Sequence, residues 1–179
     1  MANKKNIVRR IKSAVISVSD KSNLKPLLQT LNRYNVKLIS SGGTFKAIRK
    51  LGYRCLEVSD YTGFNEILDG RVKTLHPKIH AGILNKRNNN THKREIKKNN
   101  FQNIDLVIVN FYPFEKTLNT TKNHNKIIEK IDIGGPALVR SAAKNYNDVA
   151  VITSTNQYSA LIDQLKRFKG ATKLEFRKK

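Results

Sequence analysis

The sequence is poor in cysteine, in acidic residues and in long apolar runs. A single cysteine, Cys55, excludes an internal disulfide and a cysteine-rich metal site. No apolar run approaches the ~20 residues that a transmembrane helix needs. The first apolar stretch, residues 14–18, is interrupted by Asp20 too early for a secretory signal peptide. These absences predict a soluble protein of a reducing compartment with no membrane partner, and we expect a cytoplasmic location.

Acidic residues are scarce, since 13 Asp and Glu oppose 35 Lys and Arg, and the formal net charge is +22. Such an excess attracts polyanions, and nucleic acid is the first candidate. The basic residues form no single stripe, however, and no aromatic residues alternate with them as a base-stacking surface requires. Many accompany asparagines, as in residues 88–90 and 97–100, and lysine and asparagine share A-rich codons. We attribute the charge to an AT-biased composition and expect no specific nucleic-acid partner.

The chain has 179 residues, of which 39% are hydrophobic, and this suffices for one α/β domain. Short apolar runs predict strands at residues 14–18, 36–40, 53–58, 104–110 and 149–153. Apolar spacing and helix-start signals predict helices at residues 24–31, 44–51, 91–98, 126–131, 136–145 and 156–168. This alternation indicates βαβ units and a mainly parallel sheet. We expect the domain to span 12–168, after a basic extension (1–11) and before a frayed basic tail (169–179).

Several polar segments follow the predicted strands, and ligands of parallel sheets bind at the carboxyl ends of strands. The best phosphate cradle is residues 41–44, Ser-Gly-Gly-Thr, which lead into a helix. Two glycines expose backbone N–H groups there, and the helix N-terminus favours an anion. The same four residues also suit a plain tight turn with a helix cap. They are neither a P-loop nor a dinucleotide fingerprint, because the further Gly or Gly-Lys-Ser/Thr is missing.

Other candidate groups are less specific. Residues 132–136 form a second glycine-rich helix entry, which is either a plain helix start or an anion site, and Lys144 follows on that helix. His76 and His80 have a spacing that can present two metal ligands on a helix, but Pro77 lies between them and no carboxylate completes a set, so we expect no metal site. Cys55 lies in a predicted strand, where a small buried hydrophobic role is expected.

Seven segments, in this order, together resemble one family. They are residues 17–21 (SVSDK), 40–44 (SSGGT), 59–64 (SDYTGF), 70–84 (GRVKTLHPKIHAGIL), 110–114 (NFYPF), 131–136 (IDIGGP) and 142–145 (AAKN). The set is similar to the IMP cyclohydrolase domain of the bifunctional purine biosynthesis enzyme AICAR transformylase/IMP cyclohydrolase. The resemblance covers about residues 12–165, and although each segment alone is weak, the ordered set is specific.

The resemblance implies a methylglyoxal-synthase-like three-layer α/β domain with a mainly parallel central sheet. It implies dehydrative ring closure of the ribotide FAICAR to IMP, the last step of purine nucleotide synthesis, without a metal or organic cofactor. By resemblance, Lys144 is the proton-transfer lysine, Lys73 a lysine at the reacting centre, Tyr112 a hydrogen-bonding group and Asp132 an orienting carboxylate. The matching nucleotide-contact positions are Ser19, Asp20, Lys21, Ser41, Gly42, Gly43, Thr44, Arg71, Val72, Thr74, Asn110, Phe111 and Ile133.

Two departures from the family pattern stand out. Phe111 stands where the family usually has leucine, a mild change where the backbone makes the contact. The transformylase domain, which would use 10-formyltetrahydrofolate, is absent, and residues 169–179 would begin the linker to it. The family is homodimeric partly through that domain, so the sequence leaves both a homodimer and a monomer open for this chain.

Two other proteins share the implied fold and remain as alternatives. Methylglyoxal synthase is a phosphate-releasing lyase, and the allosteric domain of carbamoyl phosphate synthetase only binds a nucleotide. A binding module would keep the phosphate cradle but would need neither Lys73 nor Lys144, which stand here within complete motifs. A nucleic-acid protein would instead depend on the surface charge.

Overall fold

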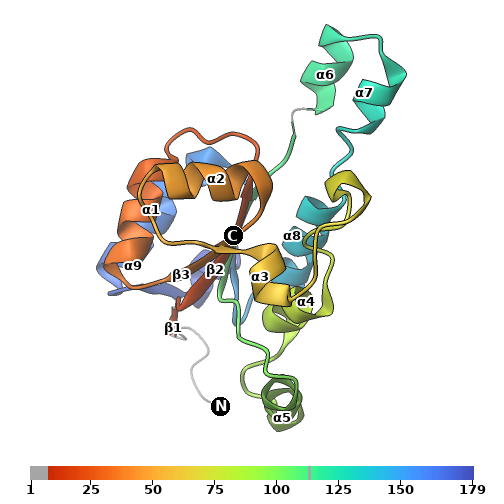
Figure 1. The fold of residues 1–179 in the computed structure, drawn as a ribbon. Coiled ribbons are helices and arrows are strands. Elements are labelled where there is room, and N and C mark those ends of the chain that lie inside the picture. Colours follow the sequence, from red (N-terminus) through yellow and green to blue (C-terminus); the bar gives the residue numbers. More distant parts are fainter. Residues whose placement is uncertain (1–7, 113) are drawn as a thin grey trace.

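The fold is built on a central sheet with helices packed around it (Figure 1). The sheet has five parallel strands in the order β4-β3-β2-β5-β6. The structure is a computed structural model that describes residues 8–112 and 114–179. The strands of the sheet are β2 (Ser13–Val18), β3 (Lys37–Ser40), β4 (Leu56–Glu57), β5 (Leu106–Asn110) and β6 (Ala150–Ile152). The predicted parallel sheet is thereby confirmed.

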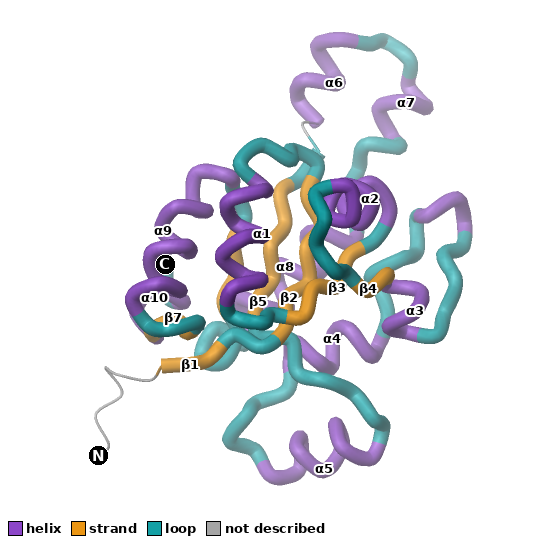
Figure 2. Tube along the Cα trace, turned by 60° about the vertical axis from the view of Figure 1, so that its left-hand side comes forward, coloured by secondary structure: helices purple, strands orange, loops and turns teal. Residues whose placement is uncertain are grey.

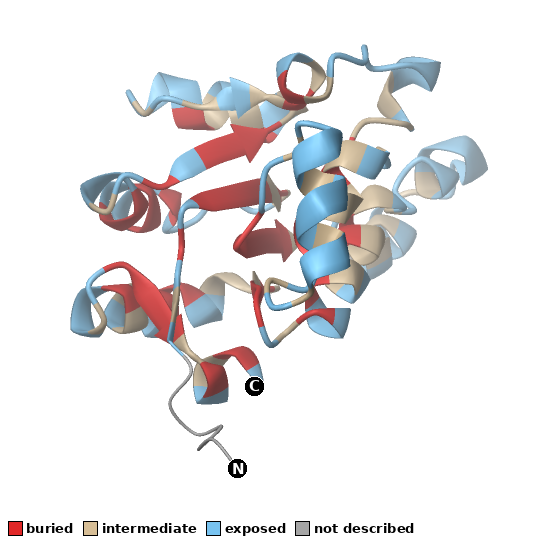
Figure 3. Cartoon of the chain, turned by 90° about the horizontal axis from the view of Figure 1, so that it is seen from below, coloured by how far each residue is buried: buried red, intermediate tan, exposed pale blue. Residues whose placement is uncertain are grey.

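Helices cover both faces of this sheet, so that the domain has three layers (Figure 2). On one face, Ala14, Ile16 and Val18 of β2 pack in a cluster with the leucines of α1 (Leu24–Arg33) and α9 (Tyr158–Arg167). On the other face, Val15 joins a second cluster with α3 (Val58–Thr62), α4 (Pro77–Leu84) and α8 (Gly134–Lys144). Figure 3 shows the strands buried between helices that expose their outer sides. The alternation of side chains along each strand therefore gives two cores, as period-two geometry requires.

The remaining helices are shorter or lie at the edges of the domain. They are α2 (Gly42–Lys50), α5 (Asn90–Lys98), α6 (Phe114–Thr120), α7 (His124–Ile128), α10 (Leu174–Arg177) and the 3-10 helices η2 (Leu68–Gly70) and η3 (Thr155–Gln157). Helices α6 and α7 project from the body of the domain (Figure 1). Within the described ranges, no helix is long and apolar enough to cross a membrane.

The structure differs from the predicted elements in two places. The strand expected at 53–58 keeps only two residues, because the chain enters α3 at Val58. The segment from 59 to 86, for which no helix or strand is predicted, contains most of α3 and all of α4. Helix α4 forms despite Pro77 because the proline occupies its first position, where an N–H has no partner in the helix, and Nδ1 of His76 accepts the N–H of Lys78 at 3.1 Å.

Both ends of the described chain belong to the folded domain, which corrects the predicted frayed tail and, for residues 8–11, the predicted extension. Residues 1–7 of that extension lie outside the described residues. Strand β1 (Val8–Arg10) pairs antiparallel with β7 (Ala171–Lys173), and the two form a small separate sheet. Ile11, Ala171 and Leu174 are buried. The many basic residues of this tail conceal the few apolar ones that anchor it, and the antiparallel partner lies about 160 positions away in sequence, as the pairing of Arg10 with Ala171 shows.

Arg177 ties the C-terminal segment to the sheet. Its side chain is buried, and the guanidinium donates hydrogen bonds to the carbonyl oxygens of Tyr146 (3.0 Å), Asn147 (3.1 Å) and Thr172 (2.5 Å). Burial, followed by the nearby positive charge of Arg9, lowers the pKa of Arg177 to about 10. The guanidinium is therefore held by its hydrogen bonds against the cost of desolvation.

We expect Arg177→Ala to lower the free energy of unfolding by about 2–4 kcal/mol, because it removes a buried side chain with its hydrogen bonds and takes this donor away from the buried carbonyl of Thr172. Urea denaturation measures the change, and Lys178→Ala, at the exposed neighbouring position, is the matched control. A loss of less than about 0.5 kcal/mol, the size of an ordinary surface substitution, would show that the tail does not contribute to stability through this side chain.

Candidate active site

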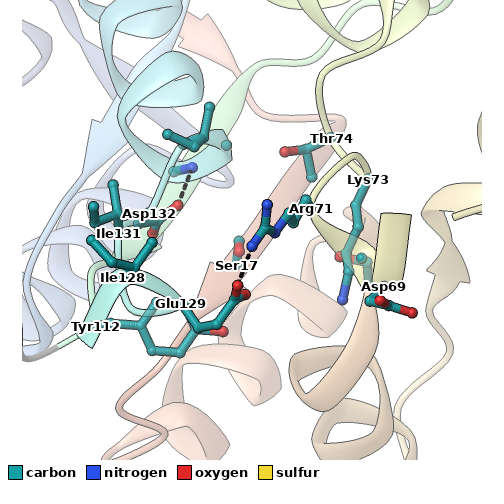
Figure 4. Close-up of a pocket in the computed structure, with 15 residues that line it drawn as sticks. Ser17, Asp69, Arg71, Lys73, Thr74, Tyr112, Ile128, Glu129, Ile131 and Asp132 are labelled. Atoms are coloured by element: carbon teal, nitrogen blue, oxygen red, sulfur yellow. Dashed lines mark hydrogen bonds and ion pairs between the residues drawn. The ribbon is translucent and has the colours of Figure 1, made fainter. Parts of the chain in front are cut away.

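A polar cavity of about 420 Å³ opens at the carboxyl ends of the central strands (Figure 4). Ser17 comes from β2, Ser41 follows β3 and Tyr112 follows β5. One further wall is the loop 69–74 and another is the segment 128–135, which leads from α7 into α8. The convergence of separate strand-end loops that the sequence predicted is therefore present.

Seven of the predicted site residues line this cavity. They are Ser41, Arg71, Lys73, Thr74, Tyr112, Asp132 and Ile133. Lys73 also adjoins the Ser-Gly-Gly-Thr turn, since a Cβ atom placed on Gly42 would lie 3.4 Å from the Lys73 Nζ. The ammonium group thus lies beside the start of α2, next to the predicted phosphate cradle.

The two glycines at the start of α8 allow a close approach of side chains. The N–H of Gly135 donates to Oδ1 of Asp132 at 2.8 Å, and a Cβ atom on Gly135 would lie only 2.5 Å from Oδ2. A Cβ on Gly134 would lie 2.5 Å from Oγ1 of Thr74. Asp132 therefore accepts an N–H of the first turn of α8, and the same glycines let the loop 69–74 pack against the helix start.

Arg71 and Glu129 form an ion pair between the two walls of the cavity (Figure 4). The hydrogen bond to Glu129 is the main cause that raises the pKa of Arg71. Both side chains are exposed, so the pair contributes little to stability. Arg71 remains accessible to an anionic ligand that can replace the carboxylate.

The other predicted nucleotide-contact residues are not among those that line the cavity. They are Ser19, Asp20, Lys21, Gly42, Gly43, Thr44, Val72, Asn110 and Phe111. The side-chain oxygen of Asn110 accepts the N–H groups of Ser19 (2.6 Å) and Asp20 (2.8 Å). The hydroxyl of buried Thr44 accepts from the N–H of Val18 and donates to its carbonyl, both at 3.0 Å. Asn110 and Thr44 therefore hold the strand-end turns in place.

Lys144 is the predicted catalytic residue that the structure does not bring to the cavity. It is the exposed last residue of α8, whereas the cavity adjoins the first residues of that helix. A rise of 1.5 Å per residue separates the two ends by about 15 Å. Because α8 runs back from the carboxyl edge to β6, Lys144 lies toward the amino edge of the sheet.

Several lining residues were missed by the sequence reasoning. They are Ser17, Asp69, Gly70, Ile128, Glu129, Ile131, Gly134 and Gly135. Gly134 and Gly135 stood within a segment already singled out, and Ser17 opens a quoted motif. Glu129 carries no local signal, because its importance comes only from a partner 58 positions away in sequence.

The two histidines have separate structural roles. His76 precedes α4 and caps it, as described above. The Nδ1 of His80 lies 2.9 Å from Oγ of Ser141 on α8, and burial lowers the pKa of His80. The neutral imidazole is therefore favoured at the contact between α4 and α8.

Cys55 is half-buried against the core cluster on the α1 and α9 face, close to the predicted role. Burial raises the pKa of its thiol to about 12. The reactive form is the thiolate, so a higher pKa means that less of the thiol is in the reactive form at a given pH.

We expect a disulfide reagent at pH 8 to react with Cys55 on the order of 1,000-fold more slowly in the folded chain than in the urea-unfolded chain. Equal rates would contradict this, and the single cysteine makes the signal unambiguous.

The fold and the cavity define a class, namely an α/β domain with a polar cavity at the carboxyl edge of a parallel sheet, the place where such folds bind their ligands. Comparison with known families agrees with this class. The model of the MGS-like domain matches residues 23–137, and the chain belongs to this family. The model of the AICARFT/IMPCHase bienzyme matches residues 142–179.

Individual relatives are more specific. The chain is 47% identical over 171 residues to the bifunctional purine biosynthesis protein PurH of Bradyrhizobium diazoefficiens, a match that covers 96% of this chain and 32% of that protein. It is 49% identical over 160 residues to PurH of Acetivibrio thermocellus, covering 89% and 31%. The crystal structure of ForH superposes with a TM-score of 0.81 at 31% identity, covering 94% of this chain and 88% of that one. The chain spans about a third of the length of these curated relatives.

Proposed function

We propose that the chain is an IMP cyclohydrolase, which closes FAICAR to IMP with loss of water. One observation carries the proposal: a single cavity contains Arg71, Lys73, Thr74 and Tyr112 and also adjoins the starts of α2 and α8. Cationic and hydroxyl donors beside two helix N-termini suit a phosphorylated ligand whose other end develops negative charge. The similarity to PurH proteins and to the bienzyme family supports this substrate over other phosphorylated compounds.

The reaction joins two groups of one molecule, so the enzyme has to fix their geometry. The carboxamide nitrogen attacks the formyl carbon, a C–N bond forms, and the formyl oxygen becomes an oxyanion. The attacking nitrogen loses one proton and the formamide nitrogen loses another. The oxygen gains both protons and leaves as water, while the C=N bond forms between the former formyl carbon and the former formamide nitrogen. Such a reaction needs a cation at the oxyanion and groups that carry protons.

In the proposed mechanism, the phosphate binds at residues 41–44 with Lys21 nearby, and the reacting end lies between Lys73 and α8. The Lys73 ammonium, which is 3.4 Å from the Cβ position of Gly42, stabilises the oxyanion. Tyr112 donates a hydrogen bond, and Asp132, held by the N–H of Gly135, orients the carboxamide. Lys144 carries a proton only if it enters the cavity from a second copy of the chain.

The proposed reaction also determines which cofactors and partners we expect. Ring closure requires no cofactor, and 10-formyltetrahydrofolate belongs to the transformylase reaction, which these residues do not perform. We propose FAICAR and IMP as the ligands, a cytoplasmic location and no specific nucleic-acid partner. A homodimer is proposed because one proposed catalytic lysine lies outside the cavity of its own chain.

A ring-closure assay with purified FAICAR tests the proposal, because IMP formation changes the ultraviolet absorbance and involves a single substrate. We expect turnover without added cofactor and no release of inorganic phosphate. Phosphate release from a triose phosphate would instead favour a methylglyoxal synthase. Tight IMP binding without turnover would favour a nucleotide-binding module, and salt-resistant DNA binding without either would favour a nucleic-acid protein.

A further inference from the structure

Glu66 forms an ion pair with the proposed catalytic lysine, Lys73, from outside the main cavity. Its Oε1 lies 3.0 Å from the Nζ of Lys73, and the two side chains are 44% and 31% exposed, respectively. Glu66 does not line the main cavity. It lines a smaller cavity of about 170 Å³, whose wall includes both Lys73 and Ser41. Lys73 therefore separates the two cavities, with its substrate side in one and its carboxylate partner in the other.

Gly70 makes room for this pair. Its φ is +86°, a conformation that side chains disfavour, and a Cβ atom there would overlap with Oε1 of Glu66 and Cε of Lys73 and would lie 2.6 Å from Nζ. On the opposite side, Gly42 leaves the ammonium in ordinary contact with the start of α2. The ammonium thus lies between two glycines, with one carboxylate to fix it.

We propose that Glu66 is a positioning residue, which holds the Lys73 ammonium where the oxyanion of the reaction forms; this inference rests on the proposed function. A lysine has a flexible four-carbon stem, so an unpartnered ammonium occupies many positions. A half-exposed ion pair adds little to the stability of the fold. We therefore expect the pair to act by fixing the position of the Lys73 ammonium. A fixed donor costs no reorganisation when charge develops.

Kinetics provides the first test. We expect Glu66→Ala to lower kcat by about 10- to 100-fold, the scale of a small misplacement, with KM changed by less than about threefold. Glu66→Gln keeps an oxygen acceptor without the negative charge, so we expect its kcat to fall less than that of Glu66→Ala. In a Lys73→Ala background, Glu66→Ala has no further effect, because the group that it positions is absent. Wild-type kcat in Glu66→Ala, or a further loss in the double variant, would overturn the proposal.

Gly70→Ala tests the space that the pair needs, with Gly52→Ala as its matched control. Gly52 has a φ of +85°, and a Cβ atom placed there meets no atom within 4 Å. Both substitutions impose the same backbone strain, and only the one at Gly70 displaces the pair. We expect kcat to fall in Gly70→Ala and to remain at the wild-type value in Gly52→Ala. Equal effects of the two substitutions would contradict the proposed role of Gly70.

A spectroscopic measurement keeps the inference separate from the proposed function. After reductive ¹³C-methylation, Lys73 is assigned as the NMR signal that Lys73→Arg removes. We expect this signal to lie apart from those of exposed lysines and to move to their position in Glu66→Ala. An unchanged signal would overturn the pairing even if FAICAR is converted. A chain that shows the pairing but no FAICAR turnover would refute the proposed function and, with it, the catalytic purpose of the pair.

Discussion

Lys73→Ala is expected to lower the turnover of FAICAR by about a thousandfold while IMP binding weakens by less than about tenfold. The substitution removes the one lysine among the described residues that line the cavity, and this lysine is the proposed oxyanion donor. Loss of one oxyanion donor costs about 100- to 1,000-fold, and loss of a proton-transfer group about 100- to 10,000-fold. The phosphate contacts of residues 41–44 remain, so most of the ground-state affinity is retained.

Single-turnover kinetics and calorimetric IMP binding measure these two effects separately. Lys46→Ala, an exposed lysine on α2, is the matched control for the loss of one positive charge near this edge of the sheet. A turnover within tenfold of wild type would exclude Lys73 from the chemistry. A parallel collapse of IMP binding would instead make Lys73 a ligand-binding residue.

For Lys144, we expect Lys144→Ala to lower turnover by about 100-fold or more and a second chain to restore it. Family resemblance implies a proton-transfer role, yet about 15 Å of helix separates Lys144 from the cavity in its own chain. Both statements hold together if the lysine enters the cavity of a second copy related by a two-fold axis.

Mixing the Lys73→Ala and Lys144→Ala chains, after dissociation and reassociation, tests this condition. Random pairing makes half of the dimers mixed, and each mixed dimer has one of its two sites with both lysines present, so about a quarter of wild-type activity returns. No recovery would show that Lys144 acts within its own chain or only through the fold. Wild-type turnover of Lys144→Ala alone would remove the residue from the mechanism.

The sequence predicts this fold well where the signals are local. The apolar runs of β2 and β5 and the leucine spacing of α1 can be recognised from residues that are close together in the sequence. These local patterns predict a parallel three-layer domain. The glycine pairs after β3 and at the start of α8 likewise pointed to the cavity, because Ser41 directly before the first pair lines it and both glycines of the second pair line it.

Signals that depend on distant partners could not be found in this way. Glu129 and Glu66 are ordinary acidic residues until Arg71 and Lys73 are placed beside them. The last strand looked like a solvated tail because its partner lies at the other end of the chain. A motif identifies Lys144 by type, but the direction in which α8 crosses the sheet determines which edge the lysine reaches.

The pairing of β1 with β7 makes the domain suitable for circular permutation. Residues 8–10 and 171–173 run side by side next to the beginning of β2, across the sheet from the cavity. A linker that leads from the residues after α10 to β1 would close the backbone into a ring on the side away from the cavity and would retain Arg177. Such a circular permutant can be cut open in the turn between α6 and α7, which projects from the body, and its core would still form from the same neighbours.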